Sequence, residues 1–133
     1  MKRYVLDSYA MIAFFEDESG ADKVAEILSQ IIAGRAKGFM SVINWGEMYY
    51  NTLREGGVNE AERVLEQFNK FPIQLVDADK DQTLMAAKLK AGHPIAYADC
   101  FAAALSMQLK AEIVTGDPEF KKLCADVSVI WIA

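Results

Sequence analysis

The sequence is poor in histidine and cysteine, which limits the kinds of metal site it can hold. Among its 133 residues are one histidine, His93, and two cysteines, Cys100 and Cys124. Two cysteines make no disulfide framework, so we expect reduced thiols, although the two could bridge. A zinc site of thiolates and imidazoles is disfavoured, because only one histidine could join the cysteines.

Long apolar runs and an excess of basic residues are also missing. No stretch approaches the roughly 18 apolar residues that a membrane span requires, and Asp7 interrupts the apolar segment after Met1, so we predict no targeting segment. We therefore expect a cytoplasmic protein without a membrane partner. A net charge of -5 argues at first against a nucleic-acid partner. Divalent cations held by carboxylates would reverse the local field, however, so a phosphate substrate stays compatible.

Short apolar segments and amphipathic segments alternate along the chain. The short segments are rich in β-favouring residues, whereas the longer ones repeat apolar residues with helical spacing. Pro72, Pro94 and several glycines separate them. We predict strands at residues 4–6, 39–43, 73–76, 112–115 and 127–132, and helices at 10–15, 24–32, 44–54, 58–71, 79–90, 95–109 and 118–123.

This alternation predicts a single α/β domain over residues 1–133. The expected architecture is a three-layer α/β/α sandwich with a mainly parallel sheet of about five strands. A content of 53% hydrophobic and 25% charged residues suits a globular protein of this size. Because ligands of such sheets bind beyond the carboxyl ends of the strands, polar residues placed just after strands are the first candidates for function.

Four acids occupy such positions, and each also has a structural explanation. Asp7 and Asp117 follow the first and fourth predicted strands and could cap the helices that they precede. Glu47 lies one turn into the helix after the second strand, where Asn44 to Glu47 has the shape of a capping box. Asp99 lies among small residues in a helix that we expect to be buried, where an unpaired carboxylate would be costly.

Taken together, the four carboxylates favour a cation site. Carboxylates without a neighbouring histidine are the ligands that Mg²⁺ or Mn²⁺ prefers, and the like charges would repel one another without a cation. Such a site suits phosphodiester cleavage, because the cation activates a water and stabilises charge on the phosphate. The sequence therefore predicts that catalysis and metal binding share four residues: Asp7, Glu47, Asp99 and Asp117.

The segments that carry these acids resemble the PIN-domain family, and within it the VapC-like ribonuclease toxins of type II toxin-antitoxin systems. They are YVLDS at residues 4–8, SVINWGE at 41–47, YADCFAAA at 97–104 and VTGD at 114–117. The resemblance implies a PIN-like fold, a Mg²⁺ or Mn²⁺ site at the four acids, and endonucleolytic cleavage of single-stranded RNA. It also implies a homodimer and a cognate small antitoxin protein that occupies the site.

Two residues depart from the family pattern. Tyr9 stands where a small residue is more usual, and Cys100 replaces a common alanine after Asp99. Both bear on packing and substrate fit rather than on metal binding. Polar residues beside the acids could orient carboxylates or waters, with turn and cap roles equally open; these are Ser8, Asn44, Thr115 and, as a peripheral ligand, Glu119.

Basic and apolar residues near the acids are candidates for contacts with other molecules. Arg54, Lys88 and Lys90 are candidates for contact with RNA phosphates, with a solvated helix face as the alternative. His93 is expected in a loop. The helix after Asn44 carries more apolar surface than one buried stripe requires. The extra surface could contact a second copy in a dimer, contact an antitoxin, or simply fill the core. The apolar residues are Trp45, Met48, Tyr49, Tyr50 and Leu53.

Other functions remain open at this point. A PIN-like nuclease could process RNA without acting as a toxin, or the chain could be a non-catalytic RNA-binding or scaffolding module. A haloacid-dehalogenase-type phosphatase is disfavoured, because that family needs acids at the positions of Tyr9 and Lys121. A receiver domain is disfavoured because the adjacent acidic pair after its first strand is missing.

Overall fold

A computed structural model describes residues 1–123 and 125–133, so the expectation of a reduced thiol at Cys124 lies outside the described residues. Cys100 is a buried free thiol. The elements are β1 (Lys2–Leu6), α1 (Ser8–Phe15), α2 (Ala21–Ile32), β2 (Ala36–Ser41), α3 (Val42–Phe68), β3 (Ile73–Val76), α4 (Lys80–Gly92), α5 (Tyr97–Leu109), β4 (Glu112–Thr115), the 3-10 helix η1 (Pro118–Leu123) and β5 (Val129–Trp131).

The sheet has five parallel strands in the order β3-β2-β1-β4-β5. The prediction of a parallel five-stranded sheet is therefore confirmed. From β1 the chain builds outward through β2 to β3, and it later returns to the other side of β1 to add β4 and β5. The order of the strands thus reverses between β1 and β4, which is where ligands of open parallel sheets bind.

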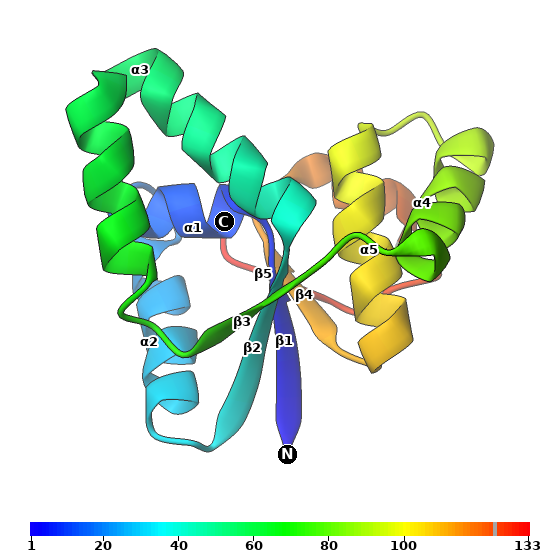
Figure 1. Ribbon diagram of the computed structural model, residues 1–133. Helices are drawn as coiled ribbons and strands as arrows, with labels where there is room; N and C mark the ends of the chain where they lie inside the picture. Colours follow the sequence, from blue (N-terminus) through cyan, green and yellow to red (C-terminus); the bar gives the residue numbers. More distant parts are fainter. Residues whose placement is uncertain (124) are drawn as a thin grey trace.

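Alternating side chains of the strands fill two separate apolar cores. Tyr4 and Leu6 of β1 pack with α1, α2 and α3, whereas Val5 between them packs with α4, α5 and η1. Neighbouring strands divide in the same way, with Met40 in the first core and Phe39 in the second. Figure 1 shows the resulting three layers, with α1 to α3 on one face of the sheet and α4 and α5 on the other.

Helix α3 begins earlier than the sequence predicted. Ser41 is its N-cap and accepts a hydrogen bond from the Ile43 amide at 3.3 Å, so the expected capping box that begins at Asn44 is wrong. Asn44 instead lies in the first turn of the helix, completely buried. The second predicted strand is correspondingly shifted and ends at Ser41. A serine hydroxyl at the end of β2 therefore starts the helix three residues before the asparagine.

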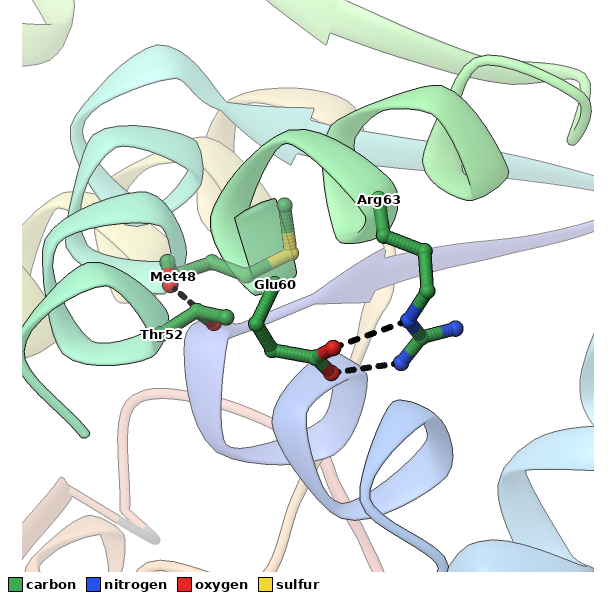
Figure 2. Close-up of polar contacts among 4 residues, drawn as sticks. All are labelled: Met48, Thr52, Glu60 and Arg63. Carbon is green, nitrogen blue, oxygen red and sulfur yellow. Dashed lines mark hydrogen bonds and ion pairs between the residues drawn. The ribbon is translucent and has the colours of Figure 1, made fainter. Parts of the chain in front are cut away.

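A bend divides α3 at the two glycines that we expected to separate two helices. Gly57 has a φ of 83° and a ψ of 180°, outside the helical region. Figure 2 shows contacts on either side of the bend: Thr52 Oγ1 donates to the carbonyl oxygen of Met48 at 2.8 Å, and Arg63 Nη2 donates to Glu60 Oε1 at 2.6 Å. The helix turns here, which lets its second half return over the sheet.

None of the helices formed by residues 1–123 and 125–133 combines the length and the apolar character needed to cross a membrane.

Candidate metal centre

Two of the four predicted acids, Asp7 and Asp117, lie at the carboxyl ends of adjacent strands. Asp7 directly follows β1, and Asp117 lies two residues beyond the end of β4. Since these two strands pair in parallel, their ends meet at the point where the strand order reverses. Glu47 enters from the first turns of α3 and Asp99 from the first turn of α5, so each layer of the sandwich contributes an acid.

Asp7 is held by hydrogen bonds to both carboxylate oxygens. Oδ1 accepts the Ala10 amide at 2.9 Å, which confirms the predicted helix cap, and Oδ2 accepts a short hydrogen bond from Thr115 Oγ1. The side chain is only 2% exposed. Burial raises the pKa of Asp7 to about 7, although the two hydrogen bonds oppose this shift. The negative charges of Asp117 and Glu47 raise it further.

Thr115 also connects Asp7 to Asp117. Its Oγ1 accepts the Asp117 amide at 3.0 Å while it donates to Asp7. Asp117 Oδ1 in turn accepts the amide of Glu119 at 2.9 Å, so Asp117 caps the 3-10 helix as the sequence allowed. A single buried hydroxyl thereby holds the two strand-terminal acids in a fixed relation.

Ser8 makes the corresponding link between α1 and α3. Its Oγ donates to Glu47 Oε1 at 2.5 Å. Asn44 has a different role, because its Nδ2 donates to the carbonyl oxygen of Ala98 at 3.0 Å, immediately before Asp99. Of the polar residues singled out from the sequence, Ser8 and Thr115 contact the acids directly, and Asn44 ties α3 to the backbone of α5.

Asp99 is buried near several other carboxylates. Burial is the main cause that raises its pKa to about 8, followed by the charge of Asp117 and a hydrogen bond with Glu119. The pKa of Glu119 is lowered, first by the Ala96 amide that donates to its Oε2 at 3.2 Å and then by the hydrogen bond with Asp99. The pKa values of the two carboxyl groups are therefore shifted in opposite directions, upward for Asp99 and downward for Glu119.

Three of the acids lie close enough to share one ion. One carboxylate oxygen from each of Asp99, Asp117 and Glu119 lies within 4.8 Å of the other two. Asp7 and Glu47 line the same cleft, which has a volume of about 320 Å³. The four acids that we predicted thus face one cleft, and Glu119, expected only at the periphery, belongs to its tightest cluster. The oxygen-only donor set fits a hard divalent cation.

Several residues of the cleft were not predicted from the sequence. Glu18, Asn51 and Ile12 also line it, and so does Tyr9, which the sequence had connected with packing and substrate fit. Asn51 follows Glu47 by one helical turn, so its presence on the same face could have been read from the i, i+4 spacing. Glu18 comes from the turn after α1, and nothing in its local sequence distinguishes it from the neighbouring acids Glu16 and Asp17.

The predicted RNA-contacting residues do not line this cleft. Arg54 is exposed on α3, with its guanidinium carbon 5.3 Å from the centroid of the Tyr50 ring. Lys88 is exposed on α4 beside a separate depression that Gln108 also lines. Lys90 lies nearer, because its Nζ donates to the carbonyl oxygen of Ile95 at 2.6 Å and its charge lowers the pKa of Glu119.

Lys122 is a further basic residue at this edge that the sequence did not single out. Its Nζ donates to the carbonyl oxygen of Pro94 at 3.1 Å, and its charge also lowers the pKa of Glu119. His93 lies in the adjacent loop, as expected, with Nδ1 2.9 Å from the carbonyl oxygen of Leu89. Two lysines therefore flank the acidic cleft on the side of the α4–α5 loop.

Sequence comparison identifies the family of the chain. A profile of the PIN domain family matches residues 4–126. The chain belongs to the PIN domain family. No curated protein matches this PIN domain significantly in sequence.

Solved structures share the fold of this PIN domain at low sequence identity. The chain is similar to VapBC2 of Rickettsia felis bound to a promoter DNA fragment (TM-score 0.79, 17% identity, 96% of this chain and 97% of that chain). It is also similar to DNA-bound VapBC of Salmonella typhimurium (TM-score 0.76, 16% identity, 100% of both chains). A third is VapC20 of Mycobacterium tuberculosis, a sarcin-ricin loop cleaving toxin (TM-score 0.73, 13% identity, 95% and 98%). The predicted resemblance to the PIN-domain family and the predicted α/β/α fold are confirmed.

Proposed function

We propose that this PIN domain is a Mg²⁺- or Mn²⁺-dependent endoribonuclease that cleaves single-stranded RNA. The observation that carries the proposal is the convergence of Asp99, Asp117 and Glu119, with oxygens within 4.8 Å, in a cleft that Asp7 and Glu47 also line. Six carboxylates in one cleft carry unfavourable repulsion, which a divalent cation would relieve. Burial is the main cause that raises the pKa of Asp7 and of Asp99, and the charges of the neighbouring acids raise both further.

The residues of the chain would divide the work in the following way. Asp99, Asp117 and Glu119 would hold the cation, with Asp7 and Glu47 as further ligands or as carboxylates that orient water. A divalent cation supplies an activated water and neutralises charge on the attacked phosphate. Thr115 and Ser8 keep Asp7 and Glu47 in place through their hydrogen bonds, so that the acids need not rearrange when substrate binds.

We also propose that the protein is the toxin of a toxin-antitoxin pair, with a small antitoxin protein as partner and a homodimer as its assembly. The likeness to VapBC complexes supports this role. On the helix considered for such contacts, Met48 is buried in the core, whereas Tyr50 is 46% exposed. Tyr50, rather than Met48, is therefore available to a partner.

The proposal is tested by incubating the purified protein with single-stranded and structured RNA, with and without Mn²⁺. We expect cleavage of the single-stranded RNA that requires Mn²⁺, and a loss of about two orders of magnitude or more in Asp7→Asn and Asp99→Asn. Asp22→Asn, an exposed acid in the first turn of α2, is the matched control and should cleave normally. Cleavage that persists in EDTA or in both cleft variants would rule out the assigned site.

The toxin role needs a separate test in cells. Expression of the wild-type protein should arrest growth, and co-expression of its proposed antitoxin partner should restore growth. Asp99→Asn should not arrest growth even when it accumulates to the same level. Active nuclease without growth arrest would favour a role in RNA processing instead.

A further inference from the structure

Tyr9 is a large aromatic residue that the proposed chemistry leaves unexplained. It follows Asp7 and Ser8 in the first turn of α1 and lines the acidic cleft. Its side chain is 40% exposed, and it belongs to neither of the two apolar cores. A tyrosine that fills no core and faces a polar cleft has apolar ring surface available for a ligand.

The position of the Tyr9 ring depends on Gly116. A Cβ placed on Gly116 would lie 2.3 Å from Cε1 of Tyr9 and 2.9 Å from Cδ1 and Cζ. The ring therefore packs directly against the backbone of the loop that joins Thr115 to Asp117. Glycine is the residue that permits this close approach. The ring is thus supported beside two of the acids by a contact that any other residue at position 116 would disturb.

Because the cleft is acidic, an uncharged contact with the RNA would add affinity that the cleft's own charges do not provide. Six acids line it, and no lysine or arginine does so among the described residues: the acids are Asp7, Glu18, Glu47, Asp99, Asp117 and Glu119. Bound cations would attract the phosphate at the site, but the surrounding carboxylates repel the rest of an RNA backbone. Stacking of a base on an aromatic ring provides affinity without a positive charge and tolerates any base.

We propose that Tyr9 is a substrate-binding residue that stacks on a nucleobase adjacent to the phosphodiester bond in the cleft, an inference that rests on the proposed ribonuclease function. Double-stranded RNA keeps its bases stacked on one another, whereas single strands can present an unstacked base to an aromatic side chain. Tyr9 thereby selects single-stranded RNA, and Gly116 is the positioning residue that holds its ring.

The direct test measures binding of a short single-stranded oligoribonucleotide that carries one 2-aminopurine, whose fluorescence is quenched by stacking. Ca²⁺ replaces Mg²⁺ so that binding is measured apart from cleavage. We expect Tyr9→Ala to weaken binding by about five- to hundred-fold and to abolish the quenching. Tyr9→Phe should retain both properties, whereas Tyr9→Leu should lose the quenching although it keeps an apolar side chain.

An abasic site in the same oligoribonucleotide identifies the stacked base. Scanned along the strand, it should weaken binding to the wild-type protein at one position and should have no effect there on Tyr9→Ala. Equal losses in the two proteins at every position would overturn the proposal. Binding that Tyr9→Ala leaves unchanged would also overturn it, and would assign the exposed ring to a protein contact instead.

Gly116→Ala provides an independent variant, because it displaces the ring while Tyr9 remains. Gly116 has no positive φ, so alanine is compatible with its backbone conformation. The substitution should weaken binding in the wild-type background and add little in the Tyr9→Ala background. Full additivity of the two substitutions would contradict the assigned contact. The melting temperature of each variant shows whether the fold is retained.

The outcomes separate this inference from the proposed function. If no RNA is cleaved but Tyr9 still quenches the bound base, the ribonuclease function fails and stacking stands. If RNA is cleaved with Mn²⁺ and the Tyr9 variants bind and cleave as the wild type does, the stacking fails alone.

Discussion

Asp7 shows how one residue can serve structure and chemistry together. Its oxygens accept hydrogen bonds from the Ala10 amide and from Thr115 Oγ1, so the carboxylate caps α1 and joins β1 to β4. A carboxylate has about four lone-pair sites, so these two bonds leave room for a cation. The cap and the cation therefore do not exclude one another, although they share the same oxygens.

The raised pKa values predict how stability depends on pH in the cation-free protein. The pKa values of Asp7 and Asp99 in the folded state are about 7 and about 8, above the ordinary value of 3.8. At pH values between the ordinary pKa and the raised pKa, the folded state binds more protons than the unfolded state. The free energy of unfolding should therefore fall as the pH rises from about 5 to about 8. The slope is at most about 1.4 kcal/mol per pH unit for each group.

This dependence is measured by urea unfolding at several pH values with EDTA present. Asp7→Asn should show a shallower decline, because one of the two titrating groups is gone. Asp22→Asn, which is exposed on α2, should follow the wild type. A free energy of unfolding that rises over this range would contradict the assigned pKa shifts.

At the scale of elements, the junction between α3 and α5 brings Glu47 and Asp99 together. Asn44 forms this junction through its bond to the carbonyl oxygen of Ala98, and it is completely buried. Asn44→Ala removes this buried hydrogen bond, so we expect a loss of about 0.5–1.5 kcal/mol in the free energy of unfolding. Asn59→Ala, on the exposed surface of the same helix, should change it by less than about 0.5 kcal/mol. Equal effects would show that the junction contributes no stability.

The bend in α3 makes a second prediction at this scale. Gly57 has a φ of 83°, which other residues adopt only with strain, so Gly57→Ala should destabilise the protein by about 1–3 kcal/mol. Gly92, at the end of α4, has no positive φ, and a Cβ placed on it would meet no described atom within 4 Å beyond the adjoining helix backbone. Gly92→Ala should therefore be neutral or slightly stabilising. Thermal unfolding of the two variants distinguishes a required bend from a general loss of glycine.

For the whole molecule, cation binding should be visible as stability. The proposed ligands of the cation come from α3, α5 and the ends of β1 and β4, which meet only in the folded chain. A bound cation should therefore stabilise the folded chain alone. Mg²⁺ or Mn²⁺ at a hundredfold excess over its dissociation constant should add about 2.7 kcal/mol. The rise in melting temperature should disappear in Asp99→Asn and remain in Asp22→Asn. An equal rise in Asp99→Asn would place the cation elsewhere.

Much of this architecture was predictable from local pattern. Alternating short apolar and amphipathic segments predicted the parallel five-stranded sandwich, and the position of Asp7 and Asp117 after strands predicted where they would meet. The start of α3 was missed, because Ser41 and Asn44 are both good caps and only the packing of β2 decides between them. Segment type follows from the sequence, whereas its boundary depends on tertiary contacts.

The sequence by itself determined the order of the elements, the apolar faces and the four acids, because these depend on residue type and spacing along the chain. Only the tertiary structure decided that Glu119 joins Asp99 and Asp117 and that the Tyr9 ring rests on Gly116. These contacts connect residues that lie 20 and 107 positions apart, Asp99 to Glu119 and Tyr9 to Gly116. Their distances are set by strand pairing and helix packing, which no local spacing encodes.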